Sequence, residues 1–161
     1  DHRGNATQSP EEADEIVTTA TKLLGLHWSD PHEKIADHPL GESDILVVAP
    51  YNAQVALIER RLAAAGLGGI EVGTVDKFQG REAPVVIVSM TASAVEDVPR
   101  GMSFLLSRNR LNVAVSRAKW AAFVVRSTAL TQYVPTTPES LMELGAFMRL
   151  TAHSTAAINR S

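Results

Sequence analysis

The stretch Val85-Val86-Ile87-Val88-Ser89-Met90 decides the fold class, because it is apolar at almost every position. Successive side chains of a strand point to opposite faces, so a continuous apolar run indicates a strand that is covered on both faces, as in a parallel sheet. Similar runs occupy residues 45–49 and 121–125, and a shorter strand is expected over residues 70–75. These four segments predict the strands of one sheet.

Segments with helical character lie between these strands and beside them. Ser9 and Pro10 suit the N-cap and the first position of a helix, and Glu12 stands at the capping-box spacing from Ser9. Further helices are expected over residues 55–66 and 141–150, from the spacing of their apolar residues. Strands that alternate with helices predict α/β architecture with a mostly parallel sheet.

The length of 161 residues suits a single domain. We expect a lead-in segment over residues 1–9, the folded domain over residues 10–150 and a flexible tail over residues 151–161. Residues 28–43 are expected to form a polar loop, and none of the histidines has the spacing of a metal site. No apolar run approaches the length of about 20 residues that a membrane-spanning helix needs.

The charge of the chain is unevenly distributed. Residues 1–45 contain ten acidic and three basic residues, whereas residues 46–161 contain eight acidic and twelve basic residues, which gives the net charge of −3. Residues 98–138 contain no acidic residue. A basic region favours an anionic partner, although a solvated surface would explain it as well. The chain lacks cysteine, which excludes disulfides, thiolate metal sites and cysteine nucleophiles and fits a cytoplasmic protein.

The most basic stretch, residues 106–119, predicts a helix of about three turns. Apolar residues from Leu111 to Ala118 would share one face of this helix, with Arg110 and Arg117 at its margin. A guanidinium that is held in place suits a phosphate group, because it can donate two parallel hydrogen bonds to phosphate oxygens. The alternative is a surface helix whose arginines are solvated.

The loop over residues 73–82 is rich in polar side chains, and Gly80 gives it conformational freedom. Functional residues of parallel sheets collect at the carboxyl ends of the strands, which points to residues 50–54, 76–82 and 91–108. Donors of several kinds at such a position suit phosphate and ribose contacts. A solvated turn with a structural glycine is the alternative.

Three segments together resemble motifs of superfamily 1 helicases. Val72-Gly73-Thr74-Val75-Asp76-Lys77-Phe78-Gln79-Gly80-Arg81-Glu82, followed by an apolar strand, resembles motif V. Residues 108–119 resemble motif VI, and residues 47–54 resemble the motif IV region. The branch is the 5′-to-3′ one, which includes the nonsense-mediated-decay RNA helicase and the replication helicase-nucleases. The resemblance covers roughly residues 4–126 and implies the second of two RecA-like domains, a three-layer fold of the P-loop NTPase type with helices on both faces of the sheet.

The resemblance also implies a nucleotide-binding set of residues. Arg117 matches the arginine finger, which stabilises charge on the transferring phosphoryl group. Glu82 matches the glutamate that approaches the ribose, and Gly80 matches the glycine whose backbone nears the phosphates. Arg110 matches the first basic position of motif VI, which either couples the nucleotide to the nucleic-acid side or fixes the helix.

A second set of residues is implied to contact nucleic acid. Thr74 matches a position that contacts the nucleic-acid backbone, and Gln79 lies between the two surfaces. Tyr51 and Gln54 match the motif IV neighbourhood. The partner implied is single-stranded nucleic acid, with DNA favoured over RNA.

The sequence has no G-x-x-x-x-G-K-[ST] loop and no acidic pair on a strand for magnesium. ATP and Mg²⁺ are therefore expected to bind mainly to a domain absent from this chain, the N-terminal RecA-like domain of the same parent. The isolated chain is expected to be inactive. A fused nuclease domain is a further partner that the resemblance allows.

Three other functions stay open from the sequence. The first is an RNA helicase of the same superfamily, because backbone contacts carry little base information. The second is a non-catalytic α/β module that binds a protein partner. The third is a small enzyme for a phosphate ligand, which is disfavoured because no nucleophile and base have a recognisable spacing.

Overall fold

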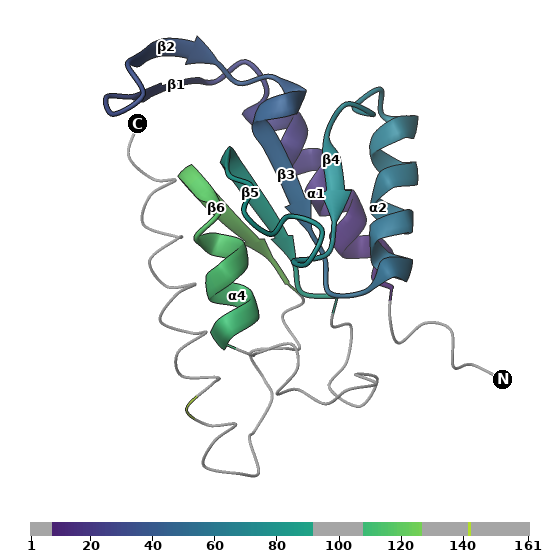
Figure 1. Cartoon of the computed structure of the whole chain (residues 1–161). Coiled ribbons are helices and arrows are strands. Elements are labelled where there is room, and N and C mark those ends of the chain that lie inside the picture. Colours follow the sequence, from purple (N-terminus) through teal and green to yellow (C-terminus); the bar gives the residue numbers. More distant parts are fainter. Residues whose placement is uncertain (1–7, 92–107, 127–141, 143–161) are drawn as a thin grey trace, which may run out of the picture.

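The computed structural model describes residues 8–91, 108–126 and 142 of the chain (Figure 1). The expected helix over residues 141–150 apart from residue 142, the tail over residues 151–161 and most of the lead-in segment lie outside these residues. None of the helices in the described part of the chain could span a bilayer.

A parallel sheet forms the centre of the fold. Its strands are β3 (Ile45–Val48), β4 (Glu71–Gly73), β5 (Ala83–Ser89) and β6 (Ala118–Val125), and their spatial order is β4-β3-β5-β6. Each neighbouring pair is parallel, so the described sheet has the predicted architecture. Val47 pairs with Val72 on one side and with Ile87 on the other, which places β3 inside the sheet. Ile87 also pairs with Phe123 of β6, so β5 is internal too.

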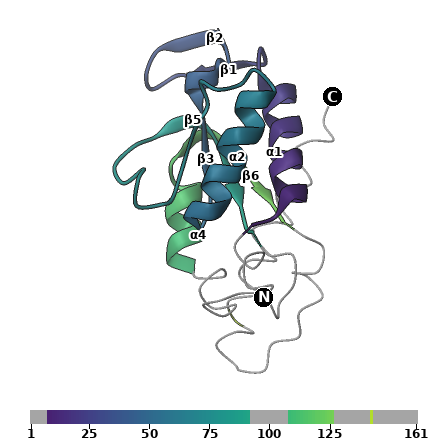
Figure 2. The ribbon, with the colours of Figure 1, turned by 90° about the vertical axis from the view of Figure 1, so that its right-hand side faces the viewer.

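Helices cover both faces of this sheet. α1 (Pro10–Leu23) and α2 (Asn52–Ala64) pack on one face, and α4 (Arg108–Val115) lies on the other (Figures 1 and 2). Ser9 caps α1, because its hydroxyl accepts a hydrogen bond from the backbone of Glu12 at 3.3 Å. Arg61 and Asp14 form an ion pair of 3.4 Å between α2 and α1.

The two faces carry separate hydrophobic cores, because side chains alternate along the strands. Ile45 and Ile87 face α1 and α2, and both are completely buried there. Leu46 and Val86 face the opposite side, where they pack with Phe78. The strands therefore read as continuous apolar runs because each side chain meets a covered face, as the sequence predicted.

A β-hairpin replaces the polar loop that was expected over residues 28–43. Its strands are β1 (His27–Asp30) and β2 (Ile35–Pro39), and a short 3₁₀ turn, η2 (Glu42–Asp44), follows it. Trp28 is only 5% exposed and joins the core beneath α1, which anchors an otherwise polar hairpin. His27 and Asp37 pair across the strands at 2.8 Å. The prediction of a loop was wrong because one buried aromatic residue outweighs the polar sequence around it.

The arginine-rich helix is shorter than predicted, because α4 ends at Val115 and Ala118 already begins β6. Arg117 lies in the turn between them, where its amide donates to the carbonyl of Ala114 at 3.3 Å. The carbonyl of Arg117 accepts a hydrogen bond from the amide of Ala83 at 3.0 Å, which joins this turn to the start of β5. The seven-residue spacing had suggested that Arg110 and Arg117 share one helix, but Arg117 lies beyond the end of α4.

Candidate functional site

The predicted nucleotide residues Glu82 and Arg117 lie at the same end of two neighbouring strands. Glu82 directly precedes β5 and Arg117 directly precedes β6, and the residues that follow them, Ala83 and Ala118, are paired in the sheet. This is the amino end of the strands, opposite the end that the general rule for parallel sheets favours. The expectation for residues 76–82 was wrong for Glu82, because the loop after β4 returns across the sheet before it reaches this residue. We call this end the amino edge.

The guanidinium of Arg117 has no carboxylate partner in the described part of the chain. Arg117 is partly buried, and its Nε atom is buried without a hydrogen-bond partner among the described residues. A buried donor without a partner costs free energy unless a ligand satisfies it. The Nε atom is therefore a donor that the described part of the fold leaves unsatisfied.

Glu82 is exposed, and no hydrogen bond or ion pair engages its side chain within the described residues. Lys119, two residues after Arg117, donates a hydrogen bond to Glu33 in the β1–β2 hairpin. This bond raises the pKa of Lys119 above its ordinary value, and the charges of Glu82 and Asp30 add smaller contributions. The charge of Lys119 is therefore paired with Glu33 of the hairpin. Among the described residues of the amino edge, Arg117 is the cation that has no carboxylate partner.

The basic residues of the loop after β4 are engaged within the fold. Lys77 donates to the carbonyl of Val72 at 2.7 Å and lies 5.5 Å from the ring centre of Phe78, which is buried. Arg81 makes two hydrogen bonds of 2.7 Å with Glu71, and this pairing lowers the pKa of Glu71 below its ordinary value. Lys77 and Arg81 therefore stabilise the conformation of this loop through contacts within the fold.

Two glycines permit this loop conformation. A Cβ atom at Gly73 would come within 3.1 Å of the Phe78 ring, which is closer than ordinary van der Waals contact. Gly80 has a φ of +78°, in the left-handed region that other residues seldom adopt. Gly80 is exposed two residues before Glu82, so its backbone is accessible beside the amino edge.

The carboxyl ends of β3 and β4 carry other predicted residues. Tyr51 follows β3, Thr74 follows β4 and both are partly buried, whereas Gln79 is exposed in the loop beyond. The amide of Ala49 donates to the carbonyl of Gly73 at 3.0 Å, so the two strand ends are held side by side. We call this end the carboxyl edge.

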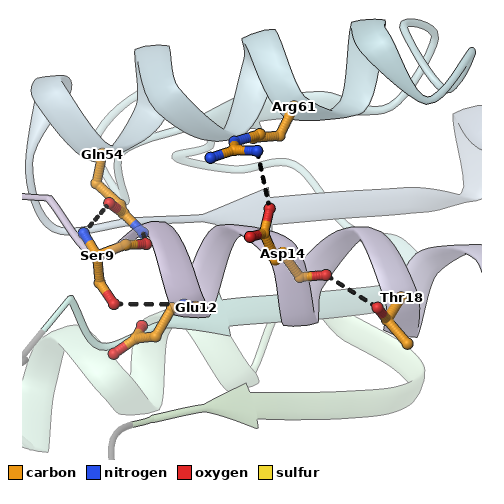
Figure 3. Close-up of polar contacts among 6 residues, drawn as sticks. All are labelled: Ser9, Glu12, Asp14, Thr18, Gln54 and Arg61. Atoms are coloured by element: carbon orange, nitrogen blue, oxygen red, sulfur yellow. Dashed lines mark hydrogen bonds and ion pairs between the residues drawn. The ribbon is translucent and has the colours of Figure 1, made fainter.

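Gln54 is not accessible at the carboxyl edge, although the sequence suggested it as a nucleic-acid contact. Its side chain is fully buried, its oxygen accepts from the amide of Ser9 at 2.7 Å, and its nitrogen donates to the carbonyl of Ser9 (Figure 3). The same nitrogen also donates to the hydroxyl of Ser89. In this arrangement it has no surface for a ligand, so we do not retain it as a contact. Arg110 lies in α4, and its side chain is outside the part that the structure describes.

Sequence reasoning missed a buried polar group around Glu12. The capping-box spacing drew attention to Glu12, but its carboxylate turns away from the helix terminus and accepts hydrogen bonds from Ser89 and Thr91. A polar residue at the end of an apolar strand, such as Ser89, was the one available signal. Within the described residues no group of three His, Cys, Asp or Glu side chains could hold a metal ion.

Comparison with known proteins identifies a family and several relatives. A family model described as an AAA domain matches residues 1–129. The DNA polymerase alpha-associated DNA helicase A of Schizosaccharomyces pombe is 50% identical over 80 residues, which is 50% of this chain and 12% of that protein. The DNA replication ATP-dependent helicase/nuclease DNA2 of Bos taurus is 40% identical over 94 residues, 58% of this chain and 9% of that protein. The 3'-5' exoribonuclease HELZ2 of Mus musculus is 30% identical over 145 residues, 84% of this chain and 4% of that protein. The chain thus spans at most 12% of the length of these three relatives.

Proposed function

Because this chain belongs to the AAA domain family and is of the superfamily 1 helicase type, we propose that it is the C-terminal motor domain of an ATP-dependent DNA helicase. The observation that carries this proposal is the pair Glu82 and Arg117 at the amino edge, since neither side chain makes a hydrogen bond or ion pair among the described residues. An anionic nucleotide would supply the missing partner of Arg117.

The amino edge supplies one wall of the nucleotide site in this proposal. Glu82 would accept a hydrogen bond from a ribose hydroxyl, and the backbone at Gly80 would approach the phosphates. Arg117 would act as the arginine finger, because its fixed guanidinium can stabilise the charge that spreads over the transferring phosphoryl group. Arg110 is a further candidate for the nucleotide. We assign the principal ATP and Mg²⁺ ligands to the N-terminal RecA-like domain of the same parent chain.

The carboxyl edge would contact single-stranded nucleic acid. Thr74 and Tyr51 lie at adjacent strand ends there, and Gln79 is exposed in the loop that follows Thr74. Side chains of this kind suit contacts to the sugar-phosphate backbone, which position a strand without reading its bases. Binding would therefore show little sequence preference and would weaken as salt concentration rises.

DNA is the preferred substrate because two of the relatives above are named DNA helicases, and one of them has the highest identity of the three. The name of the second relative also includes a nuclease, so a fused nuclease domain is part of the proposal for the parent protein. RNA is the second candidate, because the relative named an exoribonuclease aligns with 84% of this chain. The motifs themselves favour neither polymer.

ATP hydrolysis by the full-length protein tests the proposal. We expect single-stranded DNA to stimulate hydrolysis more than single-stranded RNA of equal length, with the stimulation falling as salt is added. This chain alone should hydrolyse ATP at the background rate. Stronger stimulation by RNA would support the second candidate. A protein that neither polymer stimulates would contradict the motor function and favour a non-catalytic interaction module.

A further inference from the structure

Five buried polar residues form one hydrogen-bonded group at the carboxyl end of β5. Ser9, Glu12, Gln54, Ser89 and Thr91 are each at most 3% exposed. The group joins the first turns of α1 and α2 to the point where β5 ends, and Figure 3 shows the part of it around Ser9. Buried polar side chains are uncommon unless they fix one conformation, so this group calls for a structural or functional reason.

Gln54 takes the place at the N-cap of α1 that a capping-box glutamate would have. In an ordinary capping box, a glutamate at this spacing accepts a hydrogen bond from the amide of the N-cap residue. Here Gln54 takes that place, because its oxygen accepts from the amide of Ser9 at 2.7 Å. The Oε2 atom of Glu12 instead accepts from the hydroxyl of Ser89 at 2.7 Å and from the amide of Thr91 at 2.8 Å.

Thr91 has an unusual backbone conformation at this point. Its φ is +55°, which is costly for a β-branched residue because its side chain crowds the following carbonyl. The amide of Met90 still donates to the carbonyl of Val125 at 3.0 Å, so Thr91 is the first residue beyond the ladder of β5 and β6. The conformation of Thr91 therefore sets the direction in which the chain leaves the sheet.

We propose that Glu12 is a positioning residue for the carboxyl edge, where it holds Thr91 in the left-handed conformation through the 2.8 Å hydrogen bond that it accepts from the amide of Thr91. Gln54 acts at the same edge, because its hydrogen bonds to Ser9 and Ser89 anchor the first turn of α2 immediately after Tyr51. The two residues keep the exits of β5 and β3 in fixed directions. The inference rests on the proposed function, in which this edge contacts single-stranded nucleic acid.

The first test follows the amide of Thr91 and does not depend on any ligand. Glu12→Ala should speed hydrogen exchange at this amide about tenfold or more, because it removes the acceptor of the amide's hydrogen bond. Glu12→Gln should keep most of the protection, since an amide oxygen can accept the same bond. Glu15→Ala, at an exposed position of α1, is the matched control and should change nothing at Thr91. If Glu12→Ala does not fold, Glu12→Asp replaces it, because the shorter side chain withdraws the acceptor.

The second test measures the affinity of the full-length protein for a fluorescent single strand of thymidine nucleotides. Glu12→Ala should weaken binding by about tenfold, and Thr91→Gly in the same protein should recover most of the loss. Glycine adopts the left-handed conformation without strain, so it no longer needs the carboxylate. A merely structural role for Glu12 would not be rescued by removing a second side chain.

The outcomes separate this inference from the proposed function. Unchanged exchange at Thr91 in Glu12→Ala would overturn the inference whatever the protein binds. Faster exchange with unchanged affinity for the oligonucleotide would overturn the link between Glu12 and the carboxyl edge. A wild-type protein that binds no single strand would contradict the proposed function, while the exchange result would still decide whether Glu12 positions Thr91.

Discussion

The amide of Ala83 donates a 3.0 Å hydrogen bond to the carbonyl of Arg117, and this bond joins the start of β5 to the turn before β6. Because the two strands are parallel and in register at Ala83 and Ala118, the residue before each strand lies at the same edge. Glu82 and Arg117 therefore have a fixed relationship that comes from the sheet itself. A site that requires a carboxylate and a guanidinium at constant separation can be built from these two backbone positions.

Replacement of Arg117 by alanine in the full-length protein should remove most of the ATP turnover. An arginine finger contributes about 10³–10⁵-fold to the rate in well-studied phosphoryl-transfer enzymes, and it acts mainly in the transition state. ATP binding should therefore change little, which steady-state hydrolysis and equilibrium binding of a labelled nucleotide can separate. Arg60→Ala, at an exposed position of α2, is the matched control. Equal turnover in the two variants would contradict the assignment of Arg117.

Glu82→Gln should raise the KM for ATP by about tenfold and leave kcat nearly unchanged, because a ribose contact exists in the ground state and in the transition state alike. Initial rates over a range of ATP concentrations measure both constants. Glu59→Gln, an exposed carboxylate of α2, should leave them unaltered. A fall in kcat without a change in KM would place Glu82 in the chemical step instead of at the ribose.

The sheet could be predicted from the sequence because burial on both faces leaves a signal at every position. Ile45 and Ile87 face one core and Leu46 and Val86 face the other, so no polar residue interrupts these strands. The β1–β2 hairpin left no such signal, because it depends on the buried side chain of Trp28, which joins a core built from residues distant in sequence. Long-range contacts of this kind cannot be read from local periodicity.

The end of the arginine-rich helix shows a second reason for error. Ala118 has the spacing of an apolar helical residue, but a small apolar residue fits a strand equally well, and pairing with Ala83 decides the outcome. Glu82 and Arg117 were identified through their resemblance to helicase motifs, whereas the general rule pointed to the opposite edge of the sheet. For Gln54 the resemblance to the motif IV region suggested a contact with nucleic acid, but burial determines whether an amide can reach one.

Gly80→Ala should lower the free energy of unfolding by about 1 kcal/mol, because alanine is strained at the φ of +78°. No neighbouring atom lies within 4 Å of the added methyl group, so the effect would be conformational alone. Gly68→Ala is the matched control, since that glycine also has open space around it and does not have a left-handed conformation. Urea denaturation of both variants measures the difference, and an equal effect at the two positions would rule out backbone strain at Gly80.

The pairing of Glu71 with Arg81 should make stability depend on pH in the acidic range. Hydrogen bonding to Arg81 lowers the pKa of Glu71 below its ordinary value of 4.5, so the folded protein binds this proton less readily than the unfolded chain. The pair therefore stabilises the fold fully above pH 4.5 and loses its contribution as the pH falls through the lowered pKa. Both side chains are nearly half exposed, so the contribution should be small and should shrink in high salt.

The free energies of unfolding of the wild type and of Glu71→Gln should converge at low pH and separate at neutral pH, and Glu59→Gln should show no such separation. A difference between wild type and Glu71→Gln that stays constant with pH would show that the carboxylate charge of Glu71 contributes nothing to stability.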